Sequence, residues 1–381
     1  MALTGISKVI KQELREMADK HILKGAEKVI TGIIAATGNK GPRYLLSDFP
    51  EREFLRMNSN SYLGLSLDPR VVSAEEKATH VFGTGPGAVR FISGTYQPHI
   101  DLEAGLAQFH NRESSMIFSA AYAAVMGVLP ALVTPKTIII TDALNHNCII
   151  NAVRLANPAG KMIYRHLDMD DLELKLKISI GMAQRIIVIT DGIFSMRGDH
   201  APLDEINILC ARYENFFPQG IITVIDDSHG VGVFGETGRG VEEYTQTQTD
   251  LLIGTLGKGF GVNGGYVVSS QLIVDYLRQK SPFYVYSNPI TASEAAAAHR
   301  ALQIVAGLEG AKLLARLRHL TLSLEQGLVK LGFEILPSTH PIVPLMIRDT
   351  NKTAALVNYL LEHDILVTGL NYPVVPKGDE E

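Results

Sequence analysis

The sequence predicts an α/β protein with a mainly parallel sheet that carries helices on both faces, followed by a smaller α+β C-terminal domain. Short runs rich in β-branched residues alternate with segments whose apolar residues recur every three or four positions. The first pattern is typical of buried strands and the second of amphipathic helices. Such alternation favours parallel strands covered on both faces. The strand-like runs are 137–141, 185–190, 221–225 and 251–255, and the helical segments include 148–155 and 202–213.

The pattern changes after residue 290. Residues 291–331 have the spacing of long helices and begin with a run of alanines. Beyond them, short apolar runs surround one more helical pattern, which indicates a small α+β domain. The strands expected there are 333–336, 342–347 and 365–368, and the helix is 351–363.

The N-terminal segment carries apolar residues at helical spacing among charged side chains (Ile6, Ile10, Leu14 and Met17). This pattern predicts an amphipathic helix, because a signal peptide has an uninterrupted apolar segment behind a basic start. We therefore expect three parts in the chain. They are a helical arm over 1–56, a large cofactor-binding domain over 57–290 and a small domain over 291–381.

The composition argues against several classes of protein. The 381 residues contain 35 Lys and Arg against 40 Asp and Glu, a formal net charge of −5, which does not suit a protein that binds nucleic acid. No run of about 18 apolar residues occurs, so no membrane span is expected. The two cysteines, Cys148 and Cys210, exclude a disulfide framework and favour a cytoplasmic location. Both lie in apolar patterns, and we expect them in the core.

Polar side chains follow each of the four strand-like runs. Because the carboxyl ends of parallel strands meet at one edge of a sheet, we expect these side chains to lie close together. Glycines on both sides of the one lysine among them would let the backbone turn tightly and let a bulky group approach. The residues are Asp142 and His146, Asp191 and Ser195, Asp226 and His229, and Lys258.

Taken singly, these residues leave other interpretations open. Lys258 could be an ordinary surface lysine, and Asp226 with His229 could be a zinc pair or a structural hydrogen bond. The set as a whole has the chemistry that pyridoxal phosphate requires. This cofactor forms a Schiff base with a lysine and acts as an electron sink. It needs a carboxylate at its ring nitrogen, a flat group against the ring, and hydroxyl and N–H donors for its phosphate. No metal site is expected.

Several segments resemble motifs of one family. These segments are NSNSYLGL at 58–65, GIFSMRGD at 192–199, DDSHG at 226–230 and TLGKGFG at 255–261. In them the chain resembles the α-oxoamine synthases among the fold-type-I pyridoxal-phosphate enzymes. The resemblance implies a seven-stranded, mainly parallel sheet. It points to the branches of 2-amino-3-ketobutyrate CoA ligase and 8-amino-7-oxononanoate synthase, the former through VRFISGT at 89–95 and YPVVPKG at 372–378.

This resemblance implies a role for each residue at the strand ends. Lys258 would form the Schiff base and later move a proton of the bound amino acid. Asp226 would pair with the pyridine nitrogen, and His229 would reach the phenolate oxygen. His146 would stack on the ring, and Ser195 would lie close to the same oxygen or to the substrate. These five are the catalytic residues that the resemblance implies.

Further residues would bind the phosphate or the substrate by the same resemblance. Thr255 would bind the phosphate, and Ala121 and Tyr122 would offer backbone N–H groups to it. Ser287 would reach the phosphate of the neighbouring subunit, and Asn60 would line the substrate side of the partner's site. A site completed across an interface implies a homodimer with shared active sites.

The implied reaction is a C-acyl transfer. An amino acid would condense with an acyl thioester, carried by CoA or an acyl-carrier protein, usually with loss of carbon dioxide, to give an α-amino ketone. Two other classes stay open, a non-catalytic subunit that keeps the fold and an NAD(P)-dependent oxidoreductase. The second rests on GTGPGA at 83–88, which fits a dinucleotide fingerprint although no strand-like run precedes it. His99, Asp101 and Glu103 are expected to begin a helix over 100–109 rather than to bind a metal.

The C-terminal end departs from the family pattern. Members usually continue past the segment that resembles 372–378 into a strand with an arginine for the substrate carboxylate. Some also carry an arginine near the place where Asn371 stands. We therefore expect the small domain to be truncated.

Overall fold

The computed structural model describes residues 4–19, 23, 27–372 and 375–381, which form two compact units. The large unit comprises residues 60–327 and 337–343. The small unit comprises the described residues of 1–59, 328–336 and 344–381. The boundaries after residues 56 and 290 that the sequence suggests stay a prediction.

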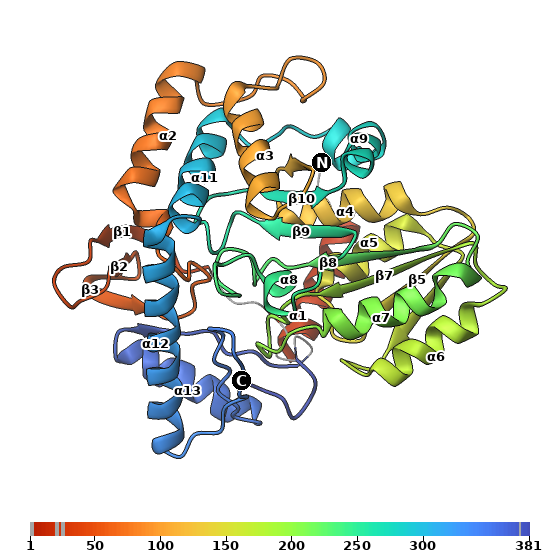
Figure 1. Ribbon diagram of the computed structural model, residues 1–381. Helices are drawn as coiled ribbons and strands as arrows, with labels where there is room; N and C mark the ends of the chain where they lie inside the picture. The colour runs from red at the N-terminus through yellow and green to blue at the C-terminus, as the bar shows by residue number, and fades with distance from the viewer. Residues whose placement is uncertain (1–3, 20–22, 24–26, 373–374) are drawn as a thin grey trace. The chain divides into compact units, whose positions relative to one another are not determined.

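A seven-stranded sheet forms the centre of the large unit (Figure 1). Its strands are β4 (Ser114–Phe118), β5 (Thr137–Asp142), β6 (Gly160–Tyr164), β7 (Arg185–Asp191), β8 (Ile221–Asp226), β9 (Leu251–Thr255) and β10 (Gly265–Ser269). They are arranged in the order β4-β10-β9-β8-β7-β5-β6. β10 is antiparallel to both of its neighbours, and the pairs from β9 to β6 are parallel. The predicted α/β class with a mainly parallel sheet is therefore confirmed, as are the four strands expected from the sequence.

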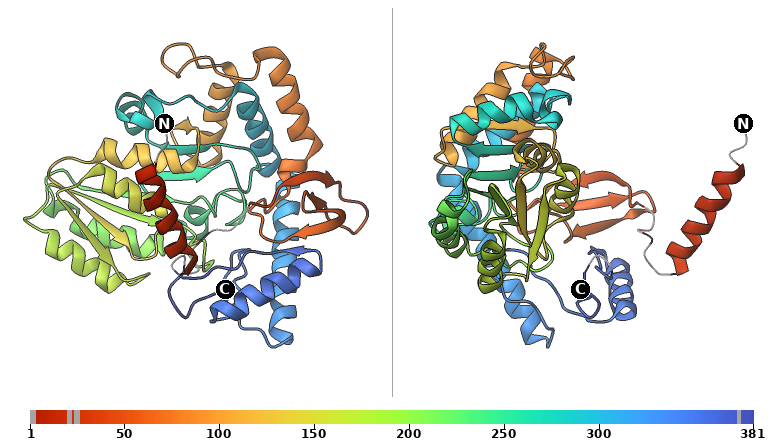
Figure 2. Two further views of the ribbon diagram at one scale, coloured as in Figure 1. Left: turned by 180° about the vertical axis from the view of Figure 1, so that it is seen from behind. Right: turned by 90° about the vertical axis from the view of Figure 1, so that its right-hand side faces the viewer.

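Helices cover both faces of this sheet (Figures 1 and 2). The helices of the large unit include the two expected over 148–155 and 202–213 and the long helices expected over 291–331. The helices are α2 (Pro69–Phe82), α3 (Gln97–Phe109), α4 (Ala121–Leu132), α5 (Asn147–Ala156), α6 (Met169–Ser179), α7 (Leu203–Tyr213), α8 (Val241–Tyr244), α9 (Gln271–Lys280), α10 (Pro282–Val285), α11 (Ala292–Val305) and most of α12 (Leu308–Lys330).

The side chains of successive strand residues pack into two separate cores, one on each face of the sheet. In β5, Ile138 and Ile140 pack into the core formed with α3, α6, α7 and α11, whereas Ile139 packs into the core formed with α4, α5 and α9. Because successive side chains of a strand point to opposite faces, a run of isoleucines can fill both cores at once. The carboxyl ends of β5, β7, β8 and β9 are left at one edge of the sheet, where the polar residues begin.

The small unit contains a second sheet with the order β1-β2-β3-β11. Its elements are α1 (Thr4–Asp19), β1 (Ile30–Ile34), β2 (Arg43–Leu46), β3 (Phe49–Arg56), α13 (Thr350–Glu362) and β11 (Ile365–Leu366). Leu46, Phe54 and Leu366 are buried together in its core. β1, β2 and β3 form an antiparallel meander, and β11 pairs with β3 in parallel.

The expected helical arm over 1–56 is wrong for most of its length. Only α1 is helical, and residues 30–56 form β1, β2 and β3 instead. The physical reason is the β-branched run of β1 and the tight turn at Ser47 and Asp48, which favour a hairpin over a helix. Residues 1–3, 20–22 and 24–26 of the predicted arm lie outside the described residues, as do 373 and 374 of the segment 372–378.

Two expected strands of the C-terminal region are also wrong. Residues 333–336 and 342–347 contribute one isolated antiparallel bridge, between Ile335 and Leu345, instead of a ladder. Pro337 and Pro344 explain this result, because a proline has no N–H to donate to a neighbouring strand. The expected strand 365–368 is shortened to β11, and the expected helix 351–363 is α13.

The segment 83–88 is not a dinucleotide site. It follows α2 rather than a strand and continues into turns rather than into a helix, so the backbone lacks the geometry that the fingerprint needs. In α3, which starts three residues earlier than expected, Glu103 is buried and forms ion pairs with Arg90 and Arg278. Across the described ranges no cluster of His, Cys, Asp and Glu could hold a metal ion.

Candidate active site

The polar residues at the strand ends, except Asp142, surround one cavity of the large unit, with a volume of about 290 Å³. All of the predicted site residues line it except Asn60 and Ser287. Asn60 is exposed, and the Ser287 hydroxyl donates to the carbonyl of Asn288 over 3.4 Å. The lining residues are Ala120, Ala121, Tyr122, His146, Cys148, Asp191, Ile193, Ser195, Asp226, Ser228, His229, Thr255 and Lys258.

Lys258 follows β9 in a turn whose glycines are required by close contacts. A Cβ at Gly259 would lie 3.0 Å from the carbonyl oxygen of Val231. Gly261 has a φ of +72°, and a Cβ there would lie 2.4 Å from the backbone nitrogen of Ser66. Burial lowers the pKa of the Lys258 amine, while the carboxylates of Asp226 and Asp191 oppose that shift. A lowered pKa favours the neutral amine, which is the nucleophilic form.

Asp226 ends β8 and has two partners that the sequence analysis did not identify. Its Oδ1 accepts hydrogen bonds from the backbone N–H and the hydroxyl of Ser228, at 3.2 and 2.6 Å. The thiol of Cys148 donates to its Oδ2 at 3.3 Å. Cys148 is buried as predicted, but it lines the cavity instead of serving only the core. Its apolar surroundings in the sequence gave no signal of this contact.

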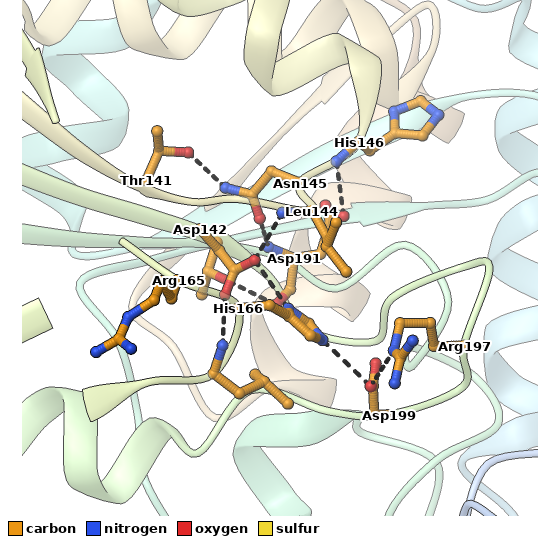
Figure 3. A network of polar contacts seen from close by, with 12 residues as sticks. Thr141, Asp142, Leu144, Asn145, His146, Arg165, His166, Asp191, Arg197 and Asp199 are labelled. Atoms are coloured by element: carbon orange, nitrogen blue, oxygen red, sulfur yellow. Dashed lines mark hydrogen bonds and ion pairs between the residues drawn. The ribbon is translucent and has the colours of Figure 1, made fainter. Parts of the chain in front are cut away.

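Asp191 lies beside Asp226 across the β7–β8 pair. Burial and the charge of Asp226 raise the pKa of Asp191 well above its ordinary value. Its Oδ2 accepts the backbone N–H of His146 at 2.8 Å, a contact drawn in Figure 3. The Nδ1 atom of His146 in turn accepts the backbone N–H of Cys148 at 3.2 Å. This bond fixes the ring at the start of α5, where its flat face can meet a bound group.

His229 forms the centre of a cluster with Tyr62 and His340. Its Nδ1 lies 2.8 Å from the Tyr62 hydroxyl, and its carbonyl oxygen lies 2.7 Å from Nε2 of His340. Burial and the nearby positive charge of Lys258 lower the pKa of His229 well below its ordinary value. Burial raises the pKa of Tyr62, so its hydroxyl keeps its proton. The hydroxyl then donates to Nδ1, and the neutral ring carries its own proton on Nε2.

His340 was not identified from the sequence, because it stands in the irregular segment 337–343 with no motif around it. It is fully buried, and burial lowers its pKa to about 4. It packs edge-on against the ring of Tyr62, with 5.5 Å between the ring centroids. Tyr62 lies in the predicted motif at 58–65, although its contact with His229 was not foreseen.

The N-terminus of α4 provides donors at another side of the cavity. Ala120 caps this helix without a side-chain hydrogen bond, so the first N–H groups, beginning at Ala121 and Tyr122, have no side-chain cap. Uncapped N–H groups at a helix start attract anions. β10 passes so close that a Cβ at Gly265 would lie 2.2 Å from the nitrogen of Ala121. The buried hydroxyl of Thr255 lies on the same cavity.

These residues fit pyridoxal phosphate. The cavity holds a buried amine for the aldehyde, a carboxylate for the ring nitrogen, and an uncapped helix start with a hydroxyl for the phosphate. Among the described residues, Oδ2 of Asp226 accepts only the weak thiol donor of Cys148. This oxygen can therefore accept a further hydrogen bond from a protonated ring nitrogen.

Comparison with family models gives a match over residues 52–379 to "Aminotransferase class I and II". The chain belongs to this family. It is 38% identical over 326 residues to 8-amino-7-oxononanoate synthase 1 of Bacillus velezensis, which covers 85% of this chain and 81% of the relative. It is 36% identical over 380 residues to the mitochondrial 2-amino-3-ketobutyrate coenzyme A ligase of Homo sapiens, covering 99% and 86%.

Among solved structures, the serine palmitoyltransferase of Sphingomonas wittichii matches with a TM-score of 0.87 and 27% identity, covering 99% of this chain and 91% of the other. The predicted membership of the α-oxoamine synthases is confirmed, and with it pyridoxal phosphate as cofactor and C-acyl transfer as the class of reaction. The comparisons give no support to an oxidoreductase. None of the helices in the described ranges has the length and apolar content needed to cross a membrane.

Proposed function

We propose that the cavity at the strand ends condenses an amino acid with an acyl thioester, with the residue roles set out below. The observation that carries the proposal is the convergence of the Lys258 amine and the Asp226 carboxylate on one cavity beside the uncapped start of α4. When bound, pyridoxal phosphate supplies an electron sink for the bond that breaks at the α-carbon of the amino acid.

Lys258 holds the cofactor through its amine and moves the α-proton of the substrate. Its lowered pKa supports both roles, because a neutral amine can attack a carbonyl carbon and can accept a proton. The two glycine contacts described above fix the turn that carries it, so the amine is directed into the cavity with little loss of rotational freedom on binding.

Asp226 holds a proton on the ring nitrogen of the cofactor. A carboxylate in a buried site makes a strong, charge-assisted hydrogen bond to a protonated nitrogen. Ser228 and Cys148 orient this carboxylate from two sides. His229 would donate its Nε2 proton to the phenolate oxygen of the cofactor, in the orientation that Tyr62 sets.

The remaining cavity residues position the cofactor and the substrate. His146 stacks on the ring, and Ser195 lies near the phenolate oxygen or the amino acid. The N–H groups of Ala121 and Tyr122 and the hydroxyl of Thr255 bind the phosphate.

The substrates are an amino acid and an acyl thioester on CoA or a carrier protein. The two kinds of relative support this class equally, since a ketobutyrate CoA ligase and an oxononanoate synthase have similar identities to the chain. These relatives do not favour one amino acid as the substrate. The loss of carbon dioxide is part of the proposal only for the oxononanoate-type reaction.

The working form is a homodimer in the cytoplasm. Support for the dimer comes from the loop at 89–95, where Phe91 and Ile92 are each 67% exposed in a single chain. Asn60 and Ser287 then act in the partner's site. Support for the compartment comes from two free, buried cysteines, which suit a reducing environment.

Lys258→Ala tests the assignment. The variant should lose the visible absorbance of the bound cofactor and its turnover, whereas Lys280→Ala, a change on the exposed side of α9, should keep both. Borohydride reduction of the wild-type protein should attach a phosphopyridoxyl group to the peptide that contains Lys258. Turnover in Lys258→Ala at the wild-type rate would refute the assignment. A wild-type protein that binds the cofactor but consumes no thioester with any amino acid would favour the non-catalytic alternative.

A further inference from the structure

A half-buried histidine outside the cavity connects two of the loops that form it. His166 follows β6, and its ring lies between two carboxylates, as Figure 3 shows. Its Nδ1 is 2.9 Å from Oδ1 of Asp142, and its Nε2 is 3.2 Å from Oδ2 of Asp199. The side chain of Asp142 is fully buried, and those of His166 and Asp199 are 18% and 26% exposed. Both ring nitrogens can donate at once only in the charged imidazolium.

Asp142 holds the loop that carries His146. Its Oδ1 also accepts the N–H of Leu144 at 2.8 Å, and its Oδ2 accepts the N–H of Leu167 at 3.0 Å. Next in the chain, Asn145 donates to the carbonyl of Ile189 at 3.0 Å. Leu144 is therefore tied to the end of β5, and Asn145 is tied to β7.

Asp199 holds the loop that carries Ser195. Its Oδ2 accepts Nε of Arg197 at 2.8 Å, and its carbonyl accepts the N–H of Phe194 at 3.0 Å. The ring of Phe194 packs edge-on against that of His166, with 4.5 Å between centroids. The turn from 194 to 199 is thus closed around the histidine.

From this geometry we infer that His166 is a positioning residue, which in its charged form clamps the loop of His146 to the loop of Ser195 and so shapes the pyridoxal-phosphate cavity. Within the described part of the chain it does not line that cavity. The inference rests on the proposed function, because both loops matter only if they face the cofactor.

The charges around the ring make the clamp dependent on pH. The ring faces Asp142 from β5, and Asp199 with Arg197 from the loop after β7. Its neighbour Arg165 pairs instead with Asp168 and Asp171. Although burial opposes the shift, the two carboxylates raise the pKa of His166 to about 9. Above that pH the neutral ring can donate to one carboxylate only and presents a lone pair to the other.

The test compares the affinity for pyridoxal phosphate of the wild-type protein and His166→Gln from pH 7.5 to 10.5. The apo-protein is titrated with the cofactor and followed by the visible circular dichroism of the bound form. We expect binding by the variant to be at least about fivefold weaker at pH 7.5, since a buried charge-assisted contact is lost. The difference should close above pH 9.5, where the wild-type protein loses the same charge.

His200→Gln is the matched control. His200 stands next to Asp199 in the chain, but its ring packs against Tyr244 and Phe234, and burial lowers its pKa. This variant should follow the wild-type curve at every pH. A ratio between wild type and His166→Gln that stays constant with pH would indicate a merely structural role and would overturn the inference, as would a ratio of one at pH 7.5.

A second variant covers the case in which His166→Gln does not fold. Asp199→Asn removes one of the two carboxylates that hold the proton on the ring, so the alkaline loss of cofactor binding should move to lower pH. An unchanged midpoint would overturn the inference. A wild-type protein that binds no pyridoxal phosphate at any pH would refute the proposed function as well, whereas normal binding with no effect of either variant would refute the clamp alone.

Discussion

Gly265→Ala should weaken the binding of pyridoxal phosphate although Gly265 itself does not line the cavity. The new Cβ would lie 2.2 Å from the nitrogen of Ala121 and 2.4 Å from the carbonyl carbon of Ala120. An ordinary contact begins near 3.4 Å, so the start of α4 must move by about 1.2 Å. Both neighbouring atoms are backbone, which cannot turn aside as a side chain could. The proposed phosphate site is therefore displaced.

The size of the effect follows from the hydrogen bonds at stake. Overpacking of this kind costs about 1–3 kcal/mol of stability. A hydrogen bond to a charged group is worth about 1.5–3 kcal/mol, so the loss of one N–H contact to the phosphate weakens binding by roughly 10- to 150-fold. Titration of the apo-protein with pyridoxal phosphate, together with thermal unfolding of both forms, measures the two effects separately.

Gly160→Ala provides the control for this experiment. It makes the same change in β6 of the same sheet, where the new Cβ meets the side chain of Ile138 at 3.3 Å and that side chain can adjust. Its cofactor affinity should equal that of the wild type. If Gly265→Ala lowers the unfolding temperature but leaves the affinity unchanged, the start of α4 does not bind the phosphate, and the reasoning is refuted.

Three further predictions concern the same cavity. Asp226→Asn should reduce turnover far more than Ser195→Ala, because the charge at the ring nitrogen is needed at every step; equal, mild losses in steady-state assays would contradict the role of Asp226. The pKa of His340 is lowered to about 4 in the folded protein, so on acidification the unfolded chain takes up the proton first. The free energy of unfolding should therefore fall between pH 6.5 and 4 by up to about 3 kcal/mol. Urea unfolding of His340→Gln should lack this pH-dependent loss. Burial raises the pKa of Cys148, so its thiol should resist alkylation in the native protein and react on unfolding, which mass spectrometry of trapped peptides can follow.

The sequence predicted the sheet well because the strands of its centre are buried on both faces. A run such as Ile138–Ile140 has no polar position, and few other structures would accept it. Other strands carry weaker patterns: β6, at one edge of the sheet, alternates exposed and half-buried residues around Lys161, and β10, which lies between β4 and β9, begins at Gly265. Neither was identified, since short mixed runs resemble loops as much as strands.

The small unit was harder to predict for a related reason. Its strands come from the two ends of the chain, and β3 pairs with β11 across about 310 residues, as in the register of Leu55 with Ile365. No local sequence pattern predicts such a pairing. The pairing is stabilised because Phe54 and Leu366, which are far apart in the chain, are buried in one shared core. Pro337 and Pro344 argue against the two strands expected beside them, because a proline cannot donate a hydrogen bond to a neighbouring strand.

The residues of the candidate site fall into two groups, those that the sequence identified and those that only the structure reveals. Those that follow central strands, such as Lys258 and His229, were identified because position and residue type both point to chemistry. Tyr62, Ser228 and His340 act through a neighbour, and their residue types are common anywhere. Only the distances in the folded chain distinguish them from ordinary polar residues.

Three parallel strands of the sheet end in an aspartate, and position at a strand end does not by itself choose one for the cofactor nitrogen. The structure separates them by their partners. Asp142 is held by His166 and two backbone N–H groups, so its negative charge is already balanced. The pKa of Asp191 is raised by burial and by its neighbour, which favours a neutral carboxyl group there. Asp226 keeps an oxygen with only a thiol donor, among the described residues, and lines the same cavity as Lys258. A protonated ring nitrogen would supply the positive charge that this carboxylate lacks, so the electrostatics of the three strand ends favour Asp226 independently of any motif.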